Sequence, residues 1–111
     1  MAFPKQVKHK FGAIRSEEDG IKFASLLEKK YYKTLKMRQQ AGDLLFFLRQ
    51  VPLHLPGNVR YVIDFVEFIA PKNGDQGDVI FTEVKGYMTE IAKLKIKQAE
   101  EIYGISINIV K

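Results

Sequence analysis

Apolar side chains recur every four residues between positions 26 and 41. Leu27, Tyr31 and Leu35 share this spacing, which places them on one face of an α-helix. Gly42 follows where a helix C-terminal cap is expected. The pattern therefore predicts a helix over residues 26–41.

The start of this helix has two candidate capping signals. Residues 16–19 (Ser-Glu-Glu-Asp) resemble one, and residues 25–28 (Ser-Leu-Leu-Glu) form a complete Ser-x-x-Glu capping box. Asp19-Gly20 is typical of a turn, and residues 21–23 alternate like a short extended piece. We therefore prefer the start at the second signal.

The rest of the chain is mostly β-like in its pattern. Residues 44–55 are rich in Leu and Phe, with Pro52 indicating an edge or a bend. Residues 59–69 (VRYVIDFVEFI) form the strongest strand pattern, with apolar residues pointing both ways. Further strands are predicted over 79–85 and 105–110, with a helix from Thr89 to about residue 103 between them.

The resulting order of elements is αβββαβ in a single α/β domain. Short turns at residues 56–58 and 71–78 join the first three strands into an antiparallel meander. The last strand returns after a helix, which favours a parallel crossover and hence a mixed sheet flanked by helices. We expect residues 1–15 to form a basic N-terminal arm and residues 16–111 to form the domain.

Composition excludes several kinds of chemistry. The chain has 111 residues and no Cys, so disulfides, zinc–thiolate sites and cysteine nucleophiles are excluded. It has two His residues and no apolar stretch that approaches a membrane span. The first residues lack the apolar run of a signal peptide. We therefore expect a cytoplasmic protein with no membrane partner.

Charge is distributed unevenly around a formal net charge of +5. Residues 1–40 hold ten basic and four acidic side chains, residues 41–84 hold three and six, and residues 85–111 hold five and three. A basic first third beside an acidic middle suits a polyanion-binding surface around a cation-binding pocket. A solvated helix face next to acidic turns would give the same counts.

Three charged residues interrupt apolar strand patterns. Asp64 lies in the strand over 59–69, while Glu83 and Lys85 lie in the strand over 79–85. Acids are depleted in strands and rarely buried without a partner. If the two strands pair, Asp64 can approach Glu83, and two neighbouring carboxylates are relieved by a shared proton or a hard divalent cation. The alternative is an Asp64–Lys85 ion pair, with Glu83 at a solvent-facing strand end.

These residues also carry a family resemblance. Ile63-Asp64, eighteen residues, and Glu83-Val84-Lys85 resemble the PD-(D/E)XK nuclease signature, although Ile63 stands where that signature often has Pro. The αβββαβ order matches the restriction-endonuclease-like core of that superfamily. Over about residues 8–111 the chain looks like small phage-encoded nucleases of this type, through the motifs DGIxFxSxxE (19–28), QVP (50–52), DF (64–65), EVKG (83–86) with Thr89, KxK (95–97) and YGI (103–105).

The resemblance implies a site. Asp64 and Glu83 would ligate Mg²⁺ or Mn²⁺, helped by the backbone carbonyl of Val84. Lys85 would be the catalytic lysine, and Glu28 would be the acid on the first helix. Glu28 could instead be only the third residue of the capping box that begins at Ser25. The catalytic and the capping interpretations both stay open here.

Several other residues are weaker candidates for a place in the site or for contact with DNA. Lys95 could face the site, and Lys93 and Lys97, four residues apart, could contact phosphates or simply be solvated. Lys8 and Lys10 of the arm could also contact phosphates. Gln50 would be a site neighbour or make a strand-end hydrogen bond. His54 is interpreted as a surface or hydrogen-bonded histidine.

The sequence thus predicts a Mg²⁺- or Mn²⁺-dependent endodeoxyribonuclease that acts on branched DNA in the manner of a Holliday junction resolvase. It would be a phage protein in the bacterial cytoplasm. The alternatives are a nicking, flap or end-processing nuclease, a DNA-binding module on the same fold without catalysis, or a regulatory protein. A homodimer is expected, joined through part of residues 44–55 or through the helix that carries Tyr31, Tyr32 and Leu35.

Overall fold

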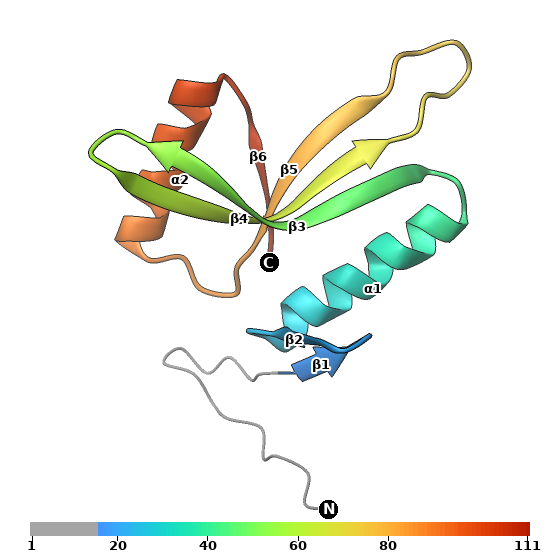
Figure 1. Cartoon of the computed structure of the whole chain (residues 1–111), viewed down its shortest axis with the longest axis horizontal. Helices are drawn as coiled ribbons and strands as arrows, with labels where there is room; N and C mark the ends of the chain where they lie inside the picture. Colours follow the sequence, from blue (N-terminus) through green and yellow to red (C-terminus); the bar gives the residue numbers. More distant parts are fainter. Residues whose placement is uncertain (1–15) are drawn as a thin grey trace, which may run out of the picture.

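A computed structural model describes residues 16–111, which form six strands and two helices (Figure 1). In chain order these are β1 (Ser16–Glu18), β2 (Ile21–Phe23), α1 (Leu26–Gln40), β3 (Leu44–Leu55), β4 (Val59–Ile69), β5 (Asp78–Val84), α2 (Glu90–Tyr103) and β6 (Ile107–Val110). The predicted basic arm, residues 1–15, lies outside the described residues.

Helix α1 begins at the second of the two capping signals. The Ser25 side chain accepts a hydrogen bond from the Glu28 backbone N–H at 3.1 Å, which satisfies one of the open donors of the first turn. The helix ends at Gln40, one residue short of the predicted end. The first capping signal does not start a helix: Ser16–Glu18 pairs antiparallel with Ile21–Phe23 through the Asp19-Gly20 turn, so that residues 16–23 form a hairpin.

The four remaining strands form one mixed sheet in the order β3-β4-β5-β6. The first two pairings are antiparallel and the last is parallel, as predicted. Three strand boundaries differ from prediction, the first being the start of β5 at Asp78 rather than at residue 79. Strand β5 ends at Val84, so Lys85 follows the strand. Strand β6 begins at Ile107, because Ile105 N–H still donates to the Glu100 carbonyl at the end of α2.

The long β3–β4 hairpin changes its covered face in the middle. Arg49 and Phe65 are paired, and both lie on the α1 side, whereas the next pair, Val51 and Ile63, packs in the cluster beneath α2. Residues two apart normally share a face, so the hairpin must twist sharply between these pairs. Figure 1 shows the strands crossing at this point, with α1 on one side of it and α2 on the other.

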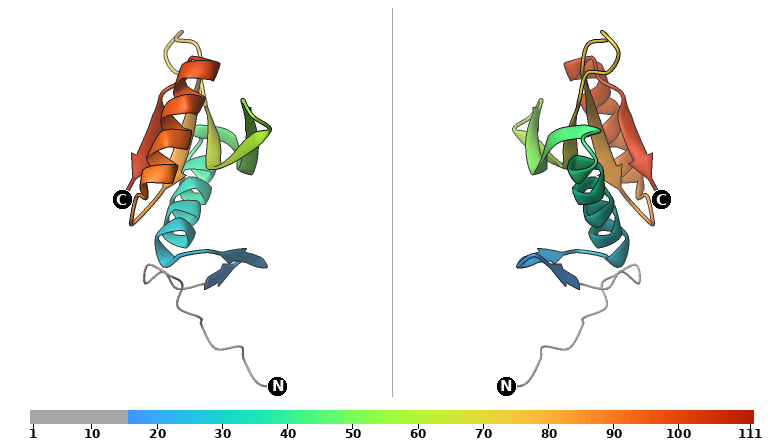
Figure 2. Two further views of the ribbon diagram at one scale, coloured as in Figure 1. Left: turned by 90° about the vertical axis from the view of Figure 1, so that its left-hand side faces the viewer. Right: turned by 90° about the vertical axis from the view of Figure 1, so that its right-hand side faces the viewer.

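Two small cores result from this switch. Beneath α2 lies a cluster made of Leu53, Leu55, Tyr61, Ile63, Val66, Ile96, Ala99 and Ile107. Beneath α1 lies a second cluster made of Phe23, Tyr32, Leu35, Leu44, Phe65 and Val84. From the side, α2 lies along β6 while α1 runs down to the β1–β2 hairpin (Figure 2). Between the Arg49–Phe65 and Val51–Ile63 pairs lie Gln50 on β3 and Asp64 on β4.

The structure excludes one of the two predicted dimer surfaces. Tyr32 and Leu35 are buried against the sheet, because they fill the core under α1, so this helix face is not available to a second chain. On β3, Leu45, Phe46 and Leu48 stay about half exposed. No helix within residues 16–111 is long and apolar enough to cross a bilayer.

Candidate functional site

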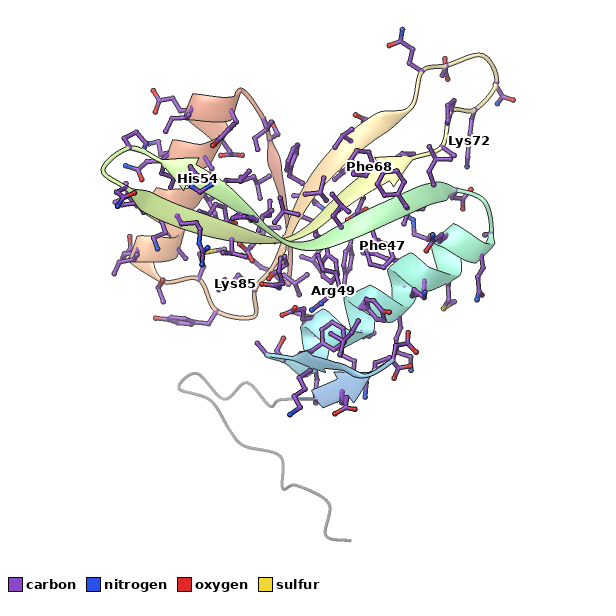
Figure 3. All side chains as sticks on the ribbon, viewed as in Figure 1. Phe47, Arg49, His54, Phe68, Lys72 and Lys85 are labelled. Carbon is purple, nitrogen blue, oxygen red and sulfur yellow. The ribbon has the colours of Figure 1, made fainter. Side chains whose placement is uncertain are left out.

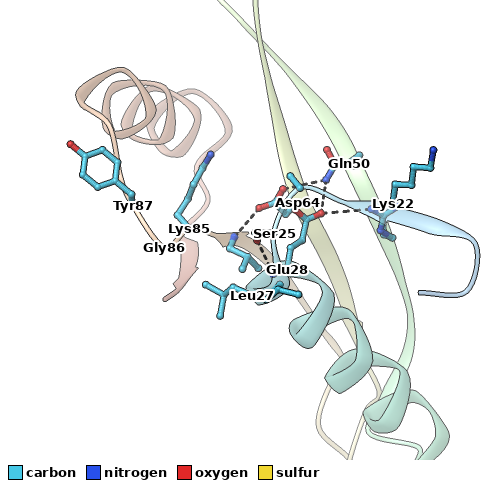
Figure 4. Close-up of a pocket in the computed structure, with 13 residues that line it drawn as sticks. Lys22, Ser25, Leu27, Glu28, Gln50, Asp64, Lys85, Gly86 and Tyr87 are labelled. Atoms are coloured by element: carbon cyan, nitrogen blue, oxygen red, sulfur yellow. Dashed lines mark hydrogen bonds and ion pairs between the residues drawn. The ribbon is translucent and has the colours of Figure 1, made fainter. Parts of the chain in front are cut away.

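A cavity of about 950 Å³ opens where the hairpin switches faces, between the start of α1 and the end of β5 (Figure 4). Acids, cations and one amide contribute to its wall. Its lining residues are Lys22, Ala24, Ser25, Leu26, Leu27, Glu28, Arg49, Gln50, Asp64, Val84, Lys85, Gly86 and Tyr87. Five of the predicted site residues, Glu28, Gln50, Asp64, Val84 and Lys85, therefore meet in one cavity.

Asp64 is fixed through both of its carboxylate oxygens. Its Oδ2 accepts a hydrogen bond from the Val84 backbone N–H at 2.9 Å, and its Oδ1 accepts one from Gln50 Nε2 at 3.2 Å. Only 9% of Asp64 is exposed. The bond to Val84 takes the place of a ladder bond just beyond the last β4–β5 pair, Phe65 with Thr82. Asp64 thus joins the two strands at the floor of the cavity.

Glu28 takes part in the helix cap through its backbone, while its side chain lines the cavity. Its N–H completes the helix cap with Ser25, but its carboxylate accepts from Gln50 Nε2 at 3.2 Å and lies 3.7 Å from Arg49 Nη2. Burial, and then the negative charge of Asp64, raise the pKa of Glu28 from 4.5 to about 7 against the opposing effects of Arg49, Lys85 and Gln50. Glu28 can therefore exchange a proton near neutral pH.

Glu83 lies behind Asp64, outside the cavity lining. It is 2% exposed and accepts a hydrogen bond from the Tyr61 hydroxyl. The alternative of a solvent-facing Glu83 is therefore wrong, because this face of β5 packs under α2. Burial, together with a hydrogen bond and the charge of Asp64, raises the pKa of Glu83 well above its ordinary value. Without a cation, this pair of acids retains a proton at neutral pH.

Lys85 lies on the segment that leaves β5 and is half-buried. Figure 4 shows Asp64 and Glu28 between Lys85 on one side and Gln50 on the other. Among the described residues no ion pair joins Lys85 to Asp64, so the predicted alternative of a simple ion pair is not formed. The Lys85 charge nevertheless lowers the pKa of Glu28 and of Glu83, against the larger effects of burial and of Asp64 that raise them.

Sequence reasoning missed Arg49, a cation of the cavity wall. Its guanidinium lies 4.7 Å from the centre of the Phe23 ring, between β3 and the β1–β2 hairpin (Figure 3). The Phe23 ring holds it in place through a cation–π contact. A signal was present in the sequence, since Arg49 is the one charged residue in the strand LLFFLRQVPLHL. Lys22, exposed on β2, was missed as well and had no such signal.

Gln50 has the most unusual backbone of the site. Its φ of +52° lies in the left-handed region, although it sits inside β3 rather than in a turn. For a residue with a side chain this conformation costs about 1 kcal/mol or more. It accompanies the change of face of the hairpin, and it aims the Gln50 amide at Glu28 and Asp64.

The remaining candidates do not line the cavity. Lys93 is exposed and pairs with Glu90 at 3.3 Å, Lys97 is exposed, and Lys95 is half-buried on α2. His54 lies at the far end of β3, where its backbone exchanges two hydrogen bonds with the Tyr103 hydroxyl (Figure 3). Lys8 and Lys10 lie outside the described residues.

The donors near Asp64 suit a hard cation by type but do not form a finished site. Carboxylate and carbonyl oxygens without Cys or His favour Mg²⁺ or Mn²⁺ over Zn²⁺. Within residues 16–111, however, no group of three or more Asp, Glu, His or Cys side chains is arranged to hold an ion. Any ion here would rest on two acids, Asp64 and Glu83, with backbone oxygen or water completing its shell.

Comparison of the chain with protein-family models, with curated proteins and with solved structures finds no match. The function must therefore be argued from the cavity and its residues.

Proposed function

We propose that this protein is a Mg²⁺- or Mn²⁺-dependent endodeoxyribonuclease that hydrolyses phosphodiester bonds. The observation that carries the proposal is the meeting of Asp64, Glu28 and Lys85 in one cavity, with the buried Glu83 next to Asp64. The element order from α1 to β6 supports it, because a nuclease core of the PD-(D/E)XK type has the same αβββαβ order.

Each residue has a role in this proposal. Asp64 and Glu83 would hold the ion together with the Val84 carbonyl. When bound, the ion would polarise the phosphodiester and lower the pKa of a water molecule. Glu28, with its pKa of about 7, can take a proton from the attacking water. Lys85 would stabilise the extra negative charge that builds up on the phosphate oxygens.

The substrate class follows from the cations of the cavity. Lys22, Arg49 and Lys85 are suited to phosphate, since Arg binds it with a planar fork and Lys with a point charge. Phosphate contacts position DNA without reading its sequence. We therefore propose that the enzyme selects DNA by shape, with branched DNA such as a four-way junction as the first candidate.

Symmetric cutting of a junction requires two active sites, so the proposal includes a homodimer. The half-exposed residues Phe46, Leu48 and Val79 offer an apolar surface on β3 and β5, where the Phe46 and Phe68 rings stack at 4.3 Å. Closed two-fold pairing is the commonest way to combine two chains. Light scattering should then give about 26 kDa, twice the 12.8 kDa chain.

The test is cleavage of a panel that contains a four-way junction, a flap, a fork, duplex and single-stranded DNA, with Mg²⁺, Mn²⁺ or EDTA. We expect metal-dependent cleavage of the junction. Lys85→Ala should lose turnover far more than DNA affinity. Its matched control is Lys72→Ala, which removes an equally long cation that pairs with Asp43 away from the cavity and should leave cleavage unchanged.

Each other outcome has a definite meaning. Cleavage of flaps or ends alone, by a monomer, would replace the junction-resolving role with end processing. Binding of DNA without cleavage in either metal would contradict the enzyme and favour a DNA-binding module.

A further inference from the structure

We propose that Gln50 is a positioning residue whose side-chain amide holds Glu28 of α1 against Asp64 of β4. The inference rests on the proposed nuclease function and adds a residue to its machinery. Gln50 Nε2 donates to Glu28 Oε1 and to Asp64 Oδ1, at 3.2 Å in both cases. One amide thus joins two acids that reach the cavity from different elements (Figure 4).

The two acids need such a link because they repel each other. The charge of Asp64 acts on Glu28 strongly enough to be the second cause of its raised pKa, after burial. Val84 N–H anchors Asp64 from the β5 side, but Glu28 has no backbone donor among its side-chain partners in the described structure. Without Gln50, Glu28 would retain only the 3.7 Å contact with Arg49.

The backbone of Gln50 is the second, independent observation. Four described residues other than glycine have positive φ, and three of them, Asp19, Asn58 and Asn73, lie in turns and are of types that tolerate this region. Gln50 alone among the four lies within a strand. A strained conformation persists where the surroundings impose it, and such residues cluster at active sites. Here the conformation aims the amide at the two acids.

Gln50→Gly tests this role, because glycine adopts positive φ without strain and removes the amide. Asn58→Gly is the matched control: it makes the same change at a φ of +61°, in the β3–β4 turn far from the cavity. Both substitutions give the unfolded chain the same extra freedom. We expect Gln50→Gly to be no less stable than Asn58→Gly in urea unfolding.

Activity should separate the two variants. We expect Gln50→Gly to lower kcat on the preferred DNA by about tenfold to a hundredfold, as misplacement of a catalytic group does, with KM changed less than about threefold. It should also weaken Mn²⁺ binding, measured by calorimetry without DNA. In a Glu28→Gln background at saturating Mn²⁺, Gln50→Gly should cost little further kcat, since Glu28 is already lost and Val84 N–H still holds Asp64. Asn58→Gly should match the wild type.

The outcomes that overturn the proposal differ from those that overturn the function. Wild-type kcat and Mn²⁺ affinity in Gln50→Gly, or equal losses of kcat with and without Glu28, would overturn the positioning role alone. A stability loss well beyond that of Asn58→Gly would make Gln50 a structural residue. A wild-type chain that neither binds Mn²⁺ nor cuts DNA would overturn the nuclease and the positioning role together.

Discussion

Glu67 and Glu83 lie on neighbouring strands of one sheet and are equally buried, with 1% and 2% of their surfaces exposed. Their surroundings differ. Glu67 receives hydrogen bonds from the Tyr31 and Thr82 hydroxyls, both at 2.6 Å, and pairs with Arg38 of α1 at 3.1 Å. A buried acid with a cation and two donors is satisfied, and it ties α1 to the sheet.

Glu83 has one donor, Tyr61, and a second acid, Asp64, beside it. The chain therefore pairs Glu67 directly with a cation, whereas Glu83 has no ion pair among the described residues and feels only the more distant charge of Lys85. A buried acid beside another acid costs free energy unless a proton or a metal ion binds there. The comparison teaches that burial alone does not mark a functional acid, whereas burial without a balancing charge does.

The largest expected effect concerns activity. Asp64→Asn should lower kcat about a thousandfold or more, because the ion loses a charged ligand worth several kcal/mol in the transition state. Glu67→Gln, the same change from acid to amide at the satisfied position, should retain most of its turnover per folded molecule. Plasmid nicking with Mg²⁺ measures both. Equal losses in the two variants would end the distinction between the two positions.

The free energy of unfolding should show the opposite dependence: it should fall on substitution of Glu67 and not on substitution of Glu83. Glu67→Gln removes a charge-assisted pair and turns an amide donor toward two hydroxyl donors, so we expect a loss of about 2 kcal/mol in the free energy of unfolding. Glu83→Gln should raise it at pH 7, since the amide has the shape of the protonated acid but avoids the free-energy cost of keeping a proton that the unfolded chain releases above about pH 4.5. Urea unfolding of both variants makes the comparison, and a larger loss for Glu83→Gln would contradict it.

Much of the fold could be predicted from local patterns. The complete Ser-x-x-Glu box marked the start of α1, and apolar runs between turn residues marked β3 and β4 to the residue. In residues 16–23 the Asp19-Gly20 turn and the extended residues 21–23 were predicted, but the strand over residues 16–18 was not, because a Ser followed by acids resembles a helix cap. Exact strand ends depend on neighbouring strands, which explains why Lys85 falls just outside β5.

The candidate site was predictable where charge interrupts an apolar strand. That signal marked Asp64 and Glu83. It applies equally to Glu67 and Arg49, which were passed over, and it cannot say which acid meets a cation, because Arg38 reaches Glu67 from a different element. The left-handed backbone of Gln50 was also beyond sequence reasoning, since nothing local to residue 50 signals that the hairpin switches faces there.

The pH dependence of stability can sharpen the comparison. Glu28 and Glu83 have raised pKa values in the folded protein, so above about pH 4.5 the folded state binds more protons than the unfolded state. The stability that these protons provide is present at low pH and is lost as pH rises, by at most about 1.4 kcal/mol per pH unit and group. For Glu28 the loss is complete near pH 7, and for Glu83 it continues above neutrality.

Two variants separate these contributions. Relative to wild type, Glu28→Gln should flatten the decline only below pH 7, whereas Glu83→Gln should flatten it both below and above pH 7. Urea unfolding in metal-free buffers between pH 5 and 9 provides the curves. Identical slopes in wild type and Glu83→Gln would show that the pair of acids holds no proton.

The smallest expected effect is the release of a proton from the Asp64–Glu83 pair when a metal ion binds. A cation binds the charged form of the acids, so Mn²⁺ binding at pH 7 should release about one proton, and its affinity should rise with pH by at most about tenfold per unit. Calorimetry in two buffers of different ionisation enthalpy counts the protons. Glu28→Gln should lower the count only slightly, because Glu28 is about half protonated at pH 7, and Glu67→Gln should leave it unchanged, because Glu67 already has Arg38 as its cation. Binding without proton release would mean that the ion lies away from Glu83, and the contrast between Glu67 and Glu83 would then carry no information about metal.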